Sequence, residues 1–313
     1  MTEVSNALPE KKARTPSLAQ KITFAIFRIF LTLSACFPLS TSRWIGRKIG
    51  WLYYKLAKKR VHIARVNIDI CFPELTANEK ESRVKNSIEE AGSWFMEAGA
   101  IWMWSDEKIL KNVQFKNIEV FNEAIALNKG VILAIPHLGN WEIMGPAVSL
   151  NNEFACFYKH DEKNHLFSEF LIKQRSRNGT VMASADPSGV RCLYKHLKAG
   201  KVIGLLPDHN PSAEMGVFAP FFEKPALTGT LISSLAKKNN ATVLSAAAIR
   251  TEAGFEIYFA KIPNQHSEDK LLAATSVNKA IEDCIRLAPE QFQWVYPRFN
   301  KRQDPSTQAS PYR

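Results

Sequence analysis

The sequence predicts an α/β domain with a mixed central sheet flanked by helices, preceded by a membrane-anchoring helix and a helical N-terminal segment. Three observations support this prediction. A long apolar stretch lies near the N-terminus, a helical pattern follows it, and from about residue 113 short β-rich runs alternate with polar helical segments. We therefore divide the chain into a disordered basic leader (1–20), a membrane-anchoring segment (21–60), a folded α/β domain (61–302) and a polar tail (303–313).

The composition is that of a globular protein with an anionic partner. Of the 313 residues, 46% are hydrophobic and 23% charged, which excludes a chain that is disordered throughout. Lys and Arg number 41 against 30 Asp and Glu, a net charge of +11, so a membrane surface, a nucleic acid or an acidic substrate is expected. The five cysteines are widely separated and form no CxxC pair, which argues against a disulfide framework or a zinc ribbon and indicates a reducing compartment.

The N-terminal segment has the pattern of a membrane anchor. The polar leader is interrupted by Pro9 and Pro16, and residues 22–39 are then almost wholly apolar apart from Arg28, close to the ~20 residues that cross a hydrocarbon core. This stretch can span a bilayer or lie along one leaflet. Cations on both sides of it argue against a secretory signal peptide. A buried core helix is the alternative, supported by Arg28 and the break at Phe37-Pro38.

The next segment, 44–60, has the composition of an interfacial helix. It mixes Trp51, Tyr53 and Tyr54 with cations, as expected for aromatic anchors beside anionic lipid. Because the cations gather around an apolar segment, a membrane is favoured over nucleic acid. Positive-inside counting favours the cytoplasmic side for this denser cluster, and a monotopic helix that dips into one leaflet fits the cations on both sides of the apolar stretch as well.

The remainder of the chain first follows a helical and then an alternating pattern. Residues 61–104 are helical, with a break at 72–76 after which Thr76 can cap the second helix. No GxGxxG or GxxxxGK[ST] loop follows a strand, so a nucleotide-binding fold has no support. The expected strands are 131–135, 154–158, 202–206, 242–249 and 255–262, and the expected helices include 187–199, 229–240 and 273–288.

The candidate site lies where the first of these apolar runs ends. His137 and Glu142 flank a Gly139-Asn140 turn, and carboxyl ends of strands commonly carry ligand-binding and catalytic groups. Asn140 can cap the following helix, which places Glu142 in its first turn and leaves backbone amides that can face an oxyanion. On one helix the two side chains would point apart, so their pairing requires the turn to fold back.

A histidine oriented by a carboxylate is a general base for a hydroxyl, because the ordinary pKa of histidine lies near working pH. The alternative is purely structural: a capping Asn140, a helix-start Glu142 and a histidine that happens to end a strand. The H-x4-E spacing alone does not decide between them.

The H-x4-E spacing after an apolar strand, with a basic membrane-seeking N-terminus, resembles the glycerolipid-type acyltransferases. The wider sequence, roughly 20–302, is similar to their lipid A branch, the late acyltransferases of lipopolysaccharide synthesis. The matching segments are Arg65-x-Asn67 before Cys71-Phe72-Pro73-Glu74, Arg175-Ser-Arg177-Asn-Gly179, Leu197-Lys-Ala-Gly200 leading to Pro207-Asp208-His209, Pro220-Phe221-Phe222, and Pro289-Glu290-Gln291-Phe292-x-Trp294 before Arg298-Phe299.

The resemblance implies roles for individual residues. His137 would activate the acceptor hydroxyl, Glu142 would orient it, and Arg175 and Asp208 would be further polar residues of the active site, together with Asn140. An arginine offers a planar fork for phosphate or carboxylate.

Arg175 or its neighbour Arg177 is therefore expected to hold an anionic acceptor group or the phosphopantetheine of the carrier, with Asp208 holding that arginine in place. The alternative for each is a surface salt bridge.

Three positions depart from the commonest wording of the family. Asp208 is followed by His209 and Asn210 where many members have Gln, Phe222 is followed by Glu223 where Gly is usual, and Tyr296-Pro297-Arg298 contains one cation fewer than expected. We expect these departures to change which acceptor and which acyl chain length the protein uses more than the reaction that it catalyses.

The resemblance thus implies an enzyme of the bacterial inner membrane, with its active site facing the cytoplasm. It would transfer a fatty acyl chain from an acyl carrier protein or coenzyme A thioester to a hydroxyl of a lipid A precursor, without an acyl-enzyme. The expected partners are acyl carrier protein, a phosphorylated glycolipid and anionic membrane lipids, and no nucleic acid.

Neither a bound cofactor nor a metal is expected, because no H-E-x-x-H pattern occurs, and a G-x-S-x-G elbow is also absent from the sequence. A lysophospholipid or amino-acid lipid acceptor, and a non-catalytic membrane-binding protein, are the alternatives.

Overall fold

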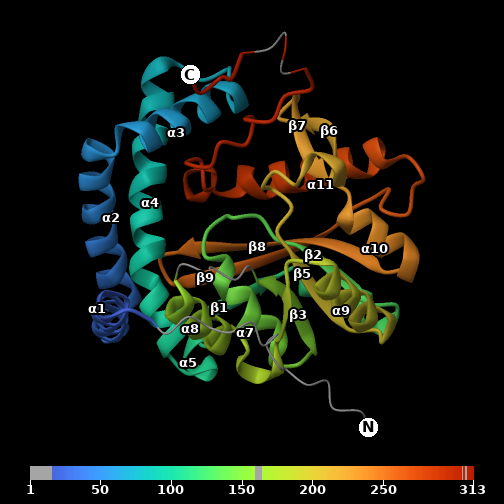
Figure 1. Cartoon of the computed structure of the whole chain (residues 1–313), viewed down its shortest axis with the longest axis horizontal. Helices are drawn as coiled ribbons and strands as arrows, with labels where there is room; N and C mark the ends of the chain where they lie inside the picture. The colour runs from blue at the N-terminus through green and yellow to red at the C-terminus, as the bar shows by residue number, and fades with distance from the viewer. Residues whose placement is uncertain (1–15, 159–163, 305, 307–308) are drawn as a thin grey trace.

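The structure is a computed structural model that describes residues 16–158, 164–304, 306 and 309–313. The centre of this described part is a seven-stranded sheet in the order β1-β9-β8-β2-β5-β3-β4 (Figure 1). Strands β8, β2, β5, β3 and β4 run parallel, and β9 and β1 run the other way, so the predicted mixed sheet is confirmed. The strands are β1 (Val113–Lys116), β2 (Val131–Ala134), β3 (Phe154–Tyr158), β4 (Val181–Ser184), β5 (Val202–Leu205), β8 (Thr242–Thr251) and β9 (Gly254–Lys261).

Strand β2 is the central strand, and all its residues are buried because both faces of the sheet are covered. Its side chains alternate between two hydrophobic clusters, Leu133 on one face and Ile132 on the other. Its last residue, Ala134, pairs in register with Leu205 of the parallel strand β5. The segments that follow β2 and β5 therefore leave the sheet side by side at the carboxyl ends of these strands.

Helices on both faces form the two clusters. α9 (Pro187–Lys198), α10 (Leu231–Asn239) and α11 (Lys270–Leu287) pack in the cluster around Ile132. The opposite cluster receives α6 (Ile118–Ala126) and α7 (Met144–Ser149). The three helices α9, α10 and α11 correspond to those expected from the sequence.

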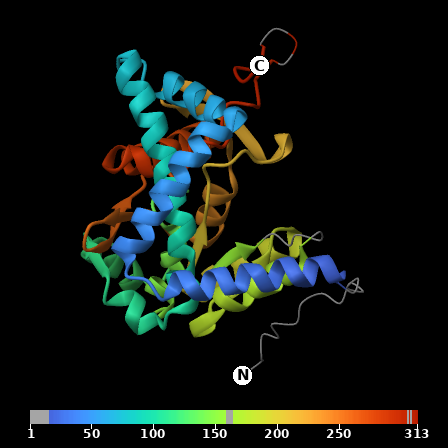
Figure 2. The same ribbon diagram turned by 90° about the vertical axis from the view of Figure 1, so that its left-hand side faces the viewer.

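The N-terminal third is helical, as predicted. α1 (Leu18–Ala35), α2 (Leu39–Leu56) and α3 (Lys58–Cys71) precede the long helix α4 (Ala77–Met103). α2 packs beside α4, and α1 crosses α4 near its C-terminal end (Figure 2). Thr76 caps α4 in a capping box with Glu79, as its position after the chain break suggested.

Glycines allow α2 to approach α4 closely. A Cβ on Gly46 would lie 2.5 Å from the carbonyl oxygen of Gly92, so a larger residue at this crossing would separate the helices. The interfacial segment is therefore joined closely to α4, which contributes to both hydrophobic clusters of the domain.

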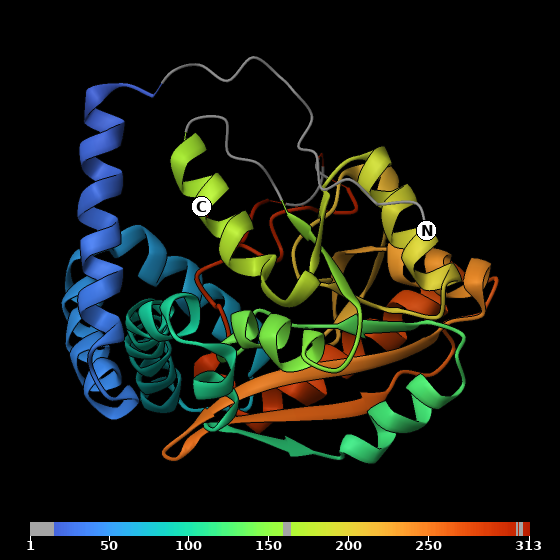
Figure 3. The same cartoon turned by 90° about the horizontal axis from the view of Figure 1, so that it is seen from below.

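α1 packs through a narrow face and leaves an apolar face uncovered. Leu31 and Ser34 are its buried residues, whereas Ile26 and Ile29 are 63% and 60% exposed. By length and composition α1 could cross a membrane. It lies along the outside of the molecule beside α8 (His165–Arg175) (Figure 3). The ring of Phe27 on α1 packs edge-on with the rings of Phe167 and Phe170 on α8.

The short edge strands β1 and β4 were not predicted from the sequence. Nor was the separate antiparallel hairpin of β6 (Gly216–Phe221) and β7 (Lys224–Gly229), which packs near α11. Residues 1–15 of the predicted leader lie outside the described residues, and the boundaries proposed at 20, 60 and 302 remain predictions. The remaining elements are α5 (Asp106–Leu110) and the 3-10 turns η1 (Trp141–Ile143), η2 (Arg177–Gly179), η3 (Ala213–Met215) and η4 (Pro289–Gln291).

Candidate active site

The register of the two central parallel strands brings His137 and Asp208 together. His137 follows Ala134 by three residues, Asp208 follows Leu205 by three, and these strand ends are paired. Asp208 Oδ1 lies 2.8 Å from Nδ1 of the His137 ring, and Oδ2 accepts the main-chain N–H of His137 at 2.7 Å. The partner of His137 is therefore Asp208, from a segment 71 residues away in the chain.

The environment keeps Asp208 ionised. Its side chain is 1% exposed, and burial by itself raises the pKa of a carboxyl group. The charge and the hydrogen bonds of His137 outweigh burial and hold the pKa of Asp208 below its ordinary value. A carboxylate only accepts hydrogen bonds, so the proton of this contact lies on Nδ1, and in the neutral ring Nε2 carries the lone pair. Among the residues that the structure describes, none hydrogen-bonds to Nε2 of His137.

The predicted pairing of His137 with Glu142 is wrong. The chain after Asn140 forms the 3-10 turn η1 with Glu142 in its first turn, and both Glu142 carboxylate oxygens accept from Arg175, with Nε at 2.8 Å and Nη2 as the second donor. The expectation that Asp208 holds the arginine fails for the same reason, because Glu142 holds Arg175.

Asn140 does not cap the helix as expected. Its side chain makes no capping hydrogen bond and instead donates through Nδ2 to Glu97 of α4 at 2.9 Å, fully inside the protein. The main-chain N–H groups of Trp141 and Glu142 nevertheless have no acceptor within the described chain. The expected free amides are therefore present at this turn.

Arg175 stands at the end of α8, and its side chain is about one-third exposed, 33% against 7% for Glu142. Burial lowers the pKa of Arg175, but the charge and hydrogen bonds of Glu142 outweigh it, so the pKa lies above its ordinary value. Cys156 of β3 lies near this pair, and burial raises the pKa of its thiol to about 12. Arg175 is thus a fixed cation, and Cys156 is a neutral thiol.

Arg177 does not share the position of Arg175. It donates to the carbonyl oxygens of Trp104 at 2.8 Å, Ile101 at 2.7 Å and Gln174 at 3.0 Å, and it lies 3.6 Å from Asp106. The guanidinium of Arg177 is thus bonded to main-chain carbonyl oxygens at the end of α4. Arg177 is therefore no longer a candidate for binding the acceptor.

Aromatic rings that the sequence analysis did not assign to the site enclose the His137 ring. His209 stacks on it with ring centres 3.9 Å apart and planes 3° apart, and Tyr296 stacks on the other face of His209 at 3.7 Å. Trp141 presents its edge to His137 at 5.0 Å and is itself stacked on Trp94. The departure from Gln at position 209 was the available signal, but only the structure shows the stack.

His209 is a neutral member of this stack. Burial, and next the charge of His137, lower its pKa to about 4. Its Nε2 lies 3.1 Å from Oε1 of Gln293, and the main-chain N–H of Gln293 donates to the carbonyl oxygen of His137 at 3.0 Å. The C-terminal segment that contains Gln293 is therefore bonded both to His209 and to the main chain of His137.

Asn67 and Arg298 belong to two of the segments that match the family, and both hold nearby segments of the chain in place. Asn67 of α3 donates to the carbonyl oxygens of Trp294 at 2.6 Å and Tyr296 at 2.8 Å. Arg298 is buried and donates to Asn210 Oδ1 at 2.8 Å and to the carbonyl oxygen of Leu227 at 2.6 Å. Both residues hold the segments on either side of the dyad, and neither contacts His137.

Within the described residues no group of three or more His, Cys, Asp or Glu side chains is placed to hold a metal ion. The polar groups of the candidate site are the His137–Asp208 dyad and the Glu142–Arg175 pair, which the turn 138–141 links in the chain. Together they comprise a histidine oriented by a carboxylate, a fixed cation and two free amides.

The chain is similar to proteins of known class over most of its length. Residues 9–301 match the family of bacterial lipid A biosynthesis acyltransferases. A lipid A biosynthesis palmitoleoyltransferase of Escherichia coli K12 is 28% identical over 270 residues, covering 85% of this chain and 87% of the relative. A lipid A biosynthesis lauroyltransferase of the same organism is 28% identical over 262 residues, 82% and 85% of the two chains. A lipid A biosynthesis acyltransferase of Haemophilus influenzae is 27% identical over 290 residues, 90% of each chain.

Proposed function

This chain belongs to the bacterial lipid A biosynthesis acyltransferase family, and from that premise we propose that it transfers a fatty acyl chain from a carrier thioester to a hydroxyl of a lipid A precursor. The observation that carries the proposal is the free Nε2 of His137, whose other ring nitrogen is fixed by Asp208. The thioester is that of acyl carrier protein or coenzyme A. The reaction belongs to lipopolysaccharide biosynthesis.

The dyad supplies the general base. Nε2 of His137 takes the proton of the acceptor hydroxyl as its oxygen attacks the thioester carbonyl carbon. The tetrahedral intermediate then collapses, the carbon–sulfur bond breaks, and the imidazolium returns the proton to the thiolate. Asp208 stabilises the imidazolium and keeps the ring in the tautomer that exposes a lone pair.

The turn after His137 supplies candidates for stabilising the oxyanion. The main-chain N–H groups of Trp141 and Glu142 are free and lie at the start of η1, where backbone donors are unpaired. The carboxylate of Glu142 holds the guanidinium of Arg175 near these amides. The remaining N–H groups of Arg175 can bind an anionic group of either substrate. We assign to the Glu142–Arg175 pair the binding and stabilisation of negative charge.

We propose direct transfer without an acyl-enzyme, and the state of the thiol beside the Glu142–Arg175 pair supports it. A nucleophilic cysteine must be a thiolate, whereas burial raises the pKa of Cys156 to about 12. His137 is therefore assigned to the acceptor hydroxyl and not to an enzyme nucleophile.

The two substrates and the membrane share one electrostatic preference. The net charge of +11 favours an acidic carrier protein, a phosphorylated glycolipid and anionic lipid headgroups. The acyl chain length is not assigned, because a palmitoleoyltransferase and a lauroyltransferase are equally similar, each 28% identical.

We further propose that α1 and α2 attach the protein to the cytoplasmic face of the bacterial inner membrane. The uncovered side chains of α1 form one stripe at three-to-four spacing, and those of α2 include Trp44 and Trp51 with Lys48 and Lys55 over their rings. The exposed apolar residues of the stripe are Leu18, Ile22, Ile26, Ile29 and Leu33.

The test is mass spectrometry of lipid A from source cells that lack the gene, complemented with the wild-type gene, with H137A or with H62A. His62 is exposed on α3 and serves as the matched histidine control. We expect one acyl chain to disappear in the deletion, and to return with the wild type and H62A but not with H137A. Unchanged lipid A in the deletion would overturn the acceptor, and the same extracts would then be searched for a missing phospholipid or amino-acid lipid. Restoration by H137A would overturn the base.

A further inference from the structure

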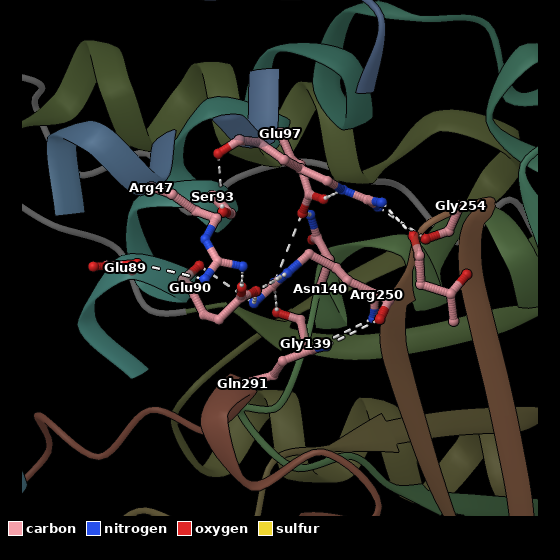
Figure 4. A network of polar contacts seen from close by, with 12 residues as sticks. Arg47, Glu89, Glu90, Ser93, Glu97, Gly139, Asn140, Arg250, Gly254 and Gln291 are labelled. Atoms are coloured by element: carbon pink, nitrogen blue, oxygen red, sulfur yellow. Dashed lines mark hydrogen bonds and ion pairs between the residues drawn. The ribbon is translucent and has the colours of Figure 1, made fainter. Parts of the chain in front are cut away.

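The turn between His137 and Glu142 is fastened to the protein by a buried ionic network (Figure 4). Asn140 donates to Glu97 Oε2 at 2.9 Å, and Arg250 of β8 donates to the carbonyl oxygen of Gly139 at 2.7 Å. The main chain adds two bonds, from Gly139 N–H to Gln291 at 3.1 Å and from Asn140 N–H to Ala248 at 2.9 Å. The side-chain half of this attachment therefore depends on Glu97 and Arg250.

Glu97 is the centre of the network. It lies in the C-terminal third of α4, its side chain is 0% exposed, and its carboxylate accepts a hydrogen bond from Nε of Arg43 of α2. Arg250 Nη1 lies 3.7 Å from its other oxygen, and Asn140 occupies that oxygen. Arg43 in turn reaches the carbonyl oxygen of Gly254 at 2.8 Å, at the turn between β8 and β9. One carboxylate thus joins α2, α4, β8 and the turn.

Charge in this network is balanced at a cost. Arg250 is 4% exposed and also pairs with Glu90 at 3.1 Å, so two arginines face two carboxylates inside the protein. Desolvating such groups is expensive, and a buried ionic network often contributes little to net stability compared with apolar residues of the same volume. What it does provide is direction, since each bond requires a defined geometry.

We propose that Glu97 is a positioning residue of the acyl-transfer site, acting through Asn140 and Arg250 on the turn that links His137 to Glu142. The inference rests on the proposed function of His137. The network sets the distance between the base and the pair that holds negative charge, and Glu97 itself touches neither substrate nor reacting atoms.

The contact between residues 97 and 140 provides a suppressor test. N140D places a second carboxylate against the buried Glu97, so the turn is pushed away; we expect kcat to fall roughly 100-fold, the scale of a ~1 Å misplacement, with KM changed less. Adding E97Q makes position 97 a donor for the new carboxylate at position 140 and an acceptor for Arg43, and restores the total charge. The double variant should recover at least about tenfold of the lost kcat.

The control is E81Q in the same N140D background. Glu81 lies on the same helix but pairs with Arg65 at the surface, where the two side chains are 41% and 43% exposed, so this substitution makes the same change of charge outside the network. The full-length enzyme would be assayed with lipid A precursor extracted from the deletion strain and acyl carrier protein carrying the acyl chain lost there. Circular dichroism and thermal melting give the folded fraction, and kcat is expressed per folded molecule.

Suppression by E97Q but not by E81Q supports the proposal. Equal kcat for N140D and N140D/E97Q, or suppression by both substitutions, would overturn it, because a residue that only stabilises the fold cannot compensate one particular charge. Failure of the wild type to transfer the acyl chain would reject the proposed function instead. If N140D does not fold, E97Q alone gives the answer: kcat lowered about tenfold per folded molecule supports positioning, and an unchanged kcat overturns it.

Discussion

Asp208 holds His137 at two points, with one carboxylate oxygen 2.8 Å from the ring nitrogen Nδ1 and the other 2.7 Å from the main-chain nitrogen of the same residue. The carboxylate therefore fixes both the position of the strand end and the rotation of the ring. A contact of this kind requires that both oxygens accept.

The first prediction concerns that requirement. In D208N one of the two positions becomes an N–H group. Facing the main-chain N–H of His137 it would oppose another donor, and facing Nδ1 it would favour the tautomer whose proton lies on Nε2. We expect kcat to fall about 10³-fold or more, because the tautomer with a free Nε2 is no longer enforced. D283N is the control, since Asp283 is 58% exposed and pairs with Lys279 far from the dyad. A loss in D208N of less than tenfold would show that His137 is oriented by other groups.

The second prediction concerns the bidentate pair of Arg175 and Glu142. In R175K an ammonium replaces the fork and cannot make two parallel bonds to one carboxylate. We expect kcat/KM to fall roughly 10- to 100-fold, equivalent to one charge-assisted hydrogen bond. R65K is the matched control, because Arg65 makes a similar two-bond pair with Glu81 at the surface, with the two side chains 43% and 41% exposed. Equal kinetics for the two variants would contradict the role of Arg175.

The third prediction concerns acid stability. His209 has a pKa of about 4 in the folded protein against an ordinary value of 6.5, so between these pH values the unfolded chain binds a proton that the folded protein does not. The free energy of unfolding therefore falls as the pH drops from 6.5 to 4, by about 3 kcal/mol from this residue. Denaturant unfolding at pH 7 and 4.5 should show a smaller difference for H209Q than for the wild type. H62Q should show the wild-type difference, and an H209Q difference equal to that of the wild type would refute the prediction.

The fourth prediction concerns the backbone of the turn. Gly139 has φ of +59°, and a Cβ there would lie 1.9 Å from the carbonyl oxygen of Ala248. G139A should destabilise the protein by about 2–6 kcal/mol and lower kcat, because the strained φ and the collision add. G145A, three residues past Glu142, meets nothing within 4 Å and should leave stability unchanged or raise it by up to ~1 kcal/mol. Thermal melting of both variants checks this, and equal melting temperatures would contradict it.

The fifth prediction concerns the apolar face of α1. I26D/I29D removes two side chains that are 63% and 60% exposed, and each would bury apolar surface in a bilayer. Partitioning into vesicles that contain anionic lipid should weaken roughly 100-fold or more. L127D/L150D makes the same change of charge at leucines 56% and 53% exposed elsewhere, and should partition like the wild type. Flotation on a density gradient measures both, and equal weakening would show that charge alone is responsible.

Local patterns in the sequence predicted much of the fold because they depend on nearby residues. The apolar run at 131–135 became the buried central strand, and Thr76 became the cap of α4 through a bond to a residue three positions away. The edge strands β1 and β4 were missed because they have four residues each and are partly exposed, so neither alternation nor a long apolar run marks them.

The candidate site was predicted as a set of residues more successfully than as a set of contacts. His137, Glu142, Arg175 and Asp208 form two pairs, but not with the predicted partners: Asp208 meets His137, and Glu142 meets Arg175. Arg177, two residues from Arg175, instead binds main-chain carbonyl groups.

The sequence by itself determined the long helices and the buried strands, the turn with its glycine, the family and the residue types of the site. Only the tertiary structure decided that β2 and β5 are neighbours, that Glu97 and Arg250 reach the turn, and that His209 stacks on His137. The physical reason is range. Helix caps and strand periodicity depend on residues within one or two turns of the chain, whereas the partner of a buried polar group depends on the order of strands and on which helix covers them, and these are settled by packing of the whole domain.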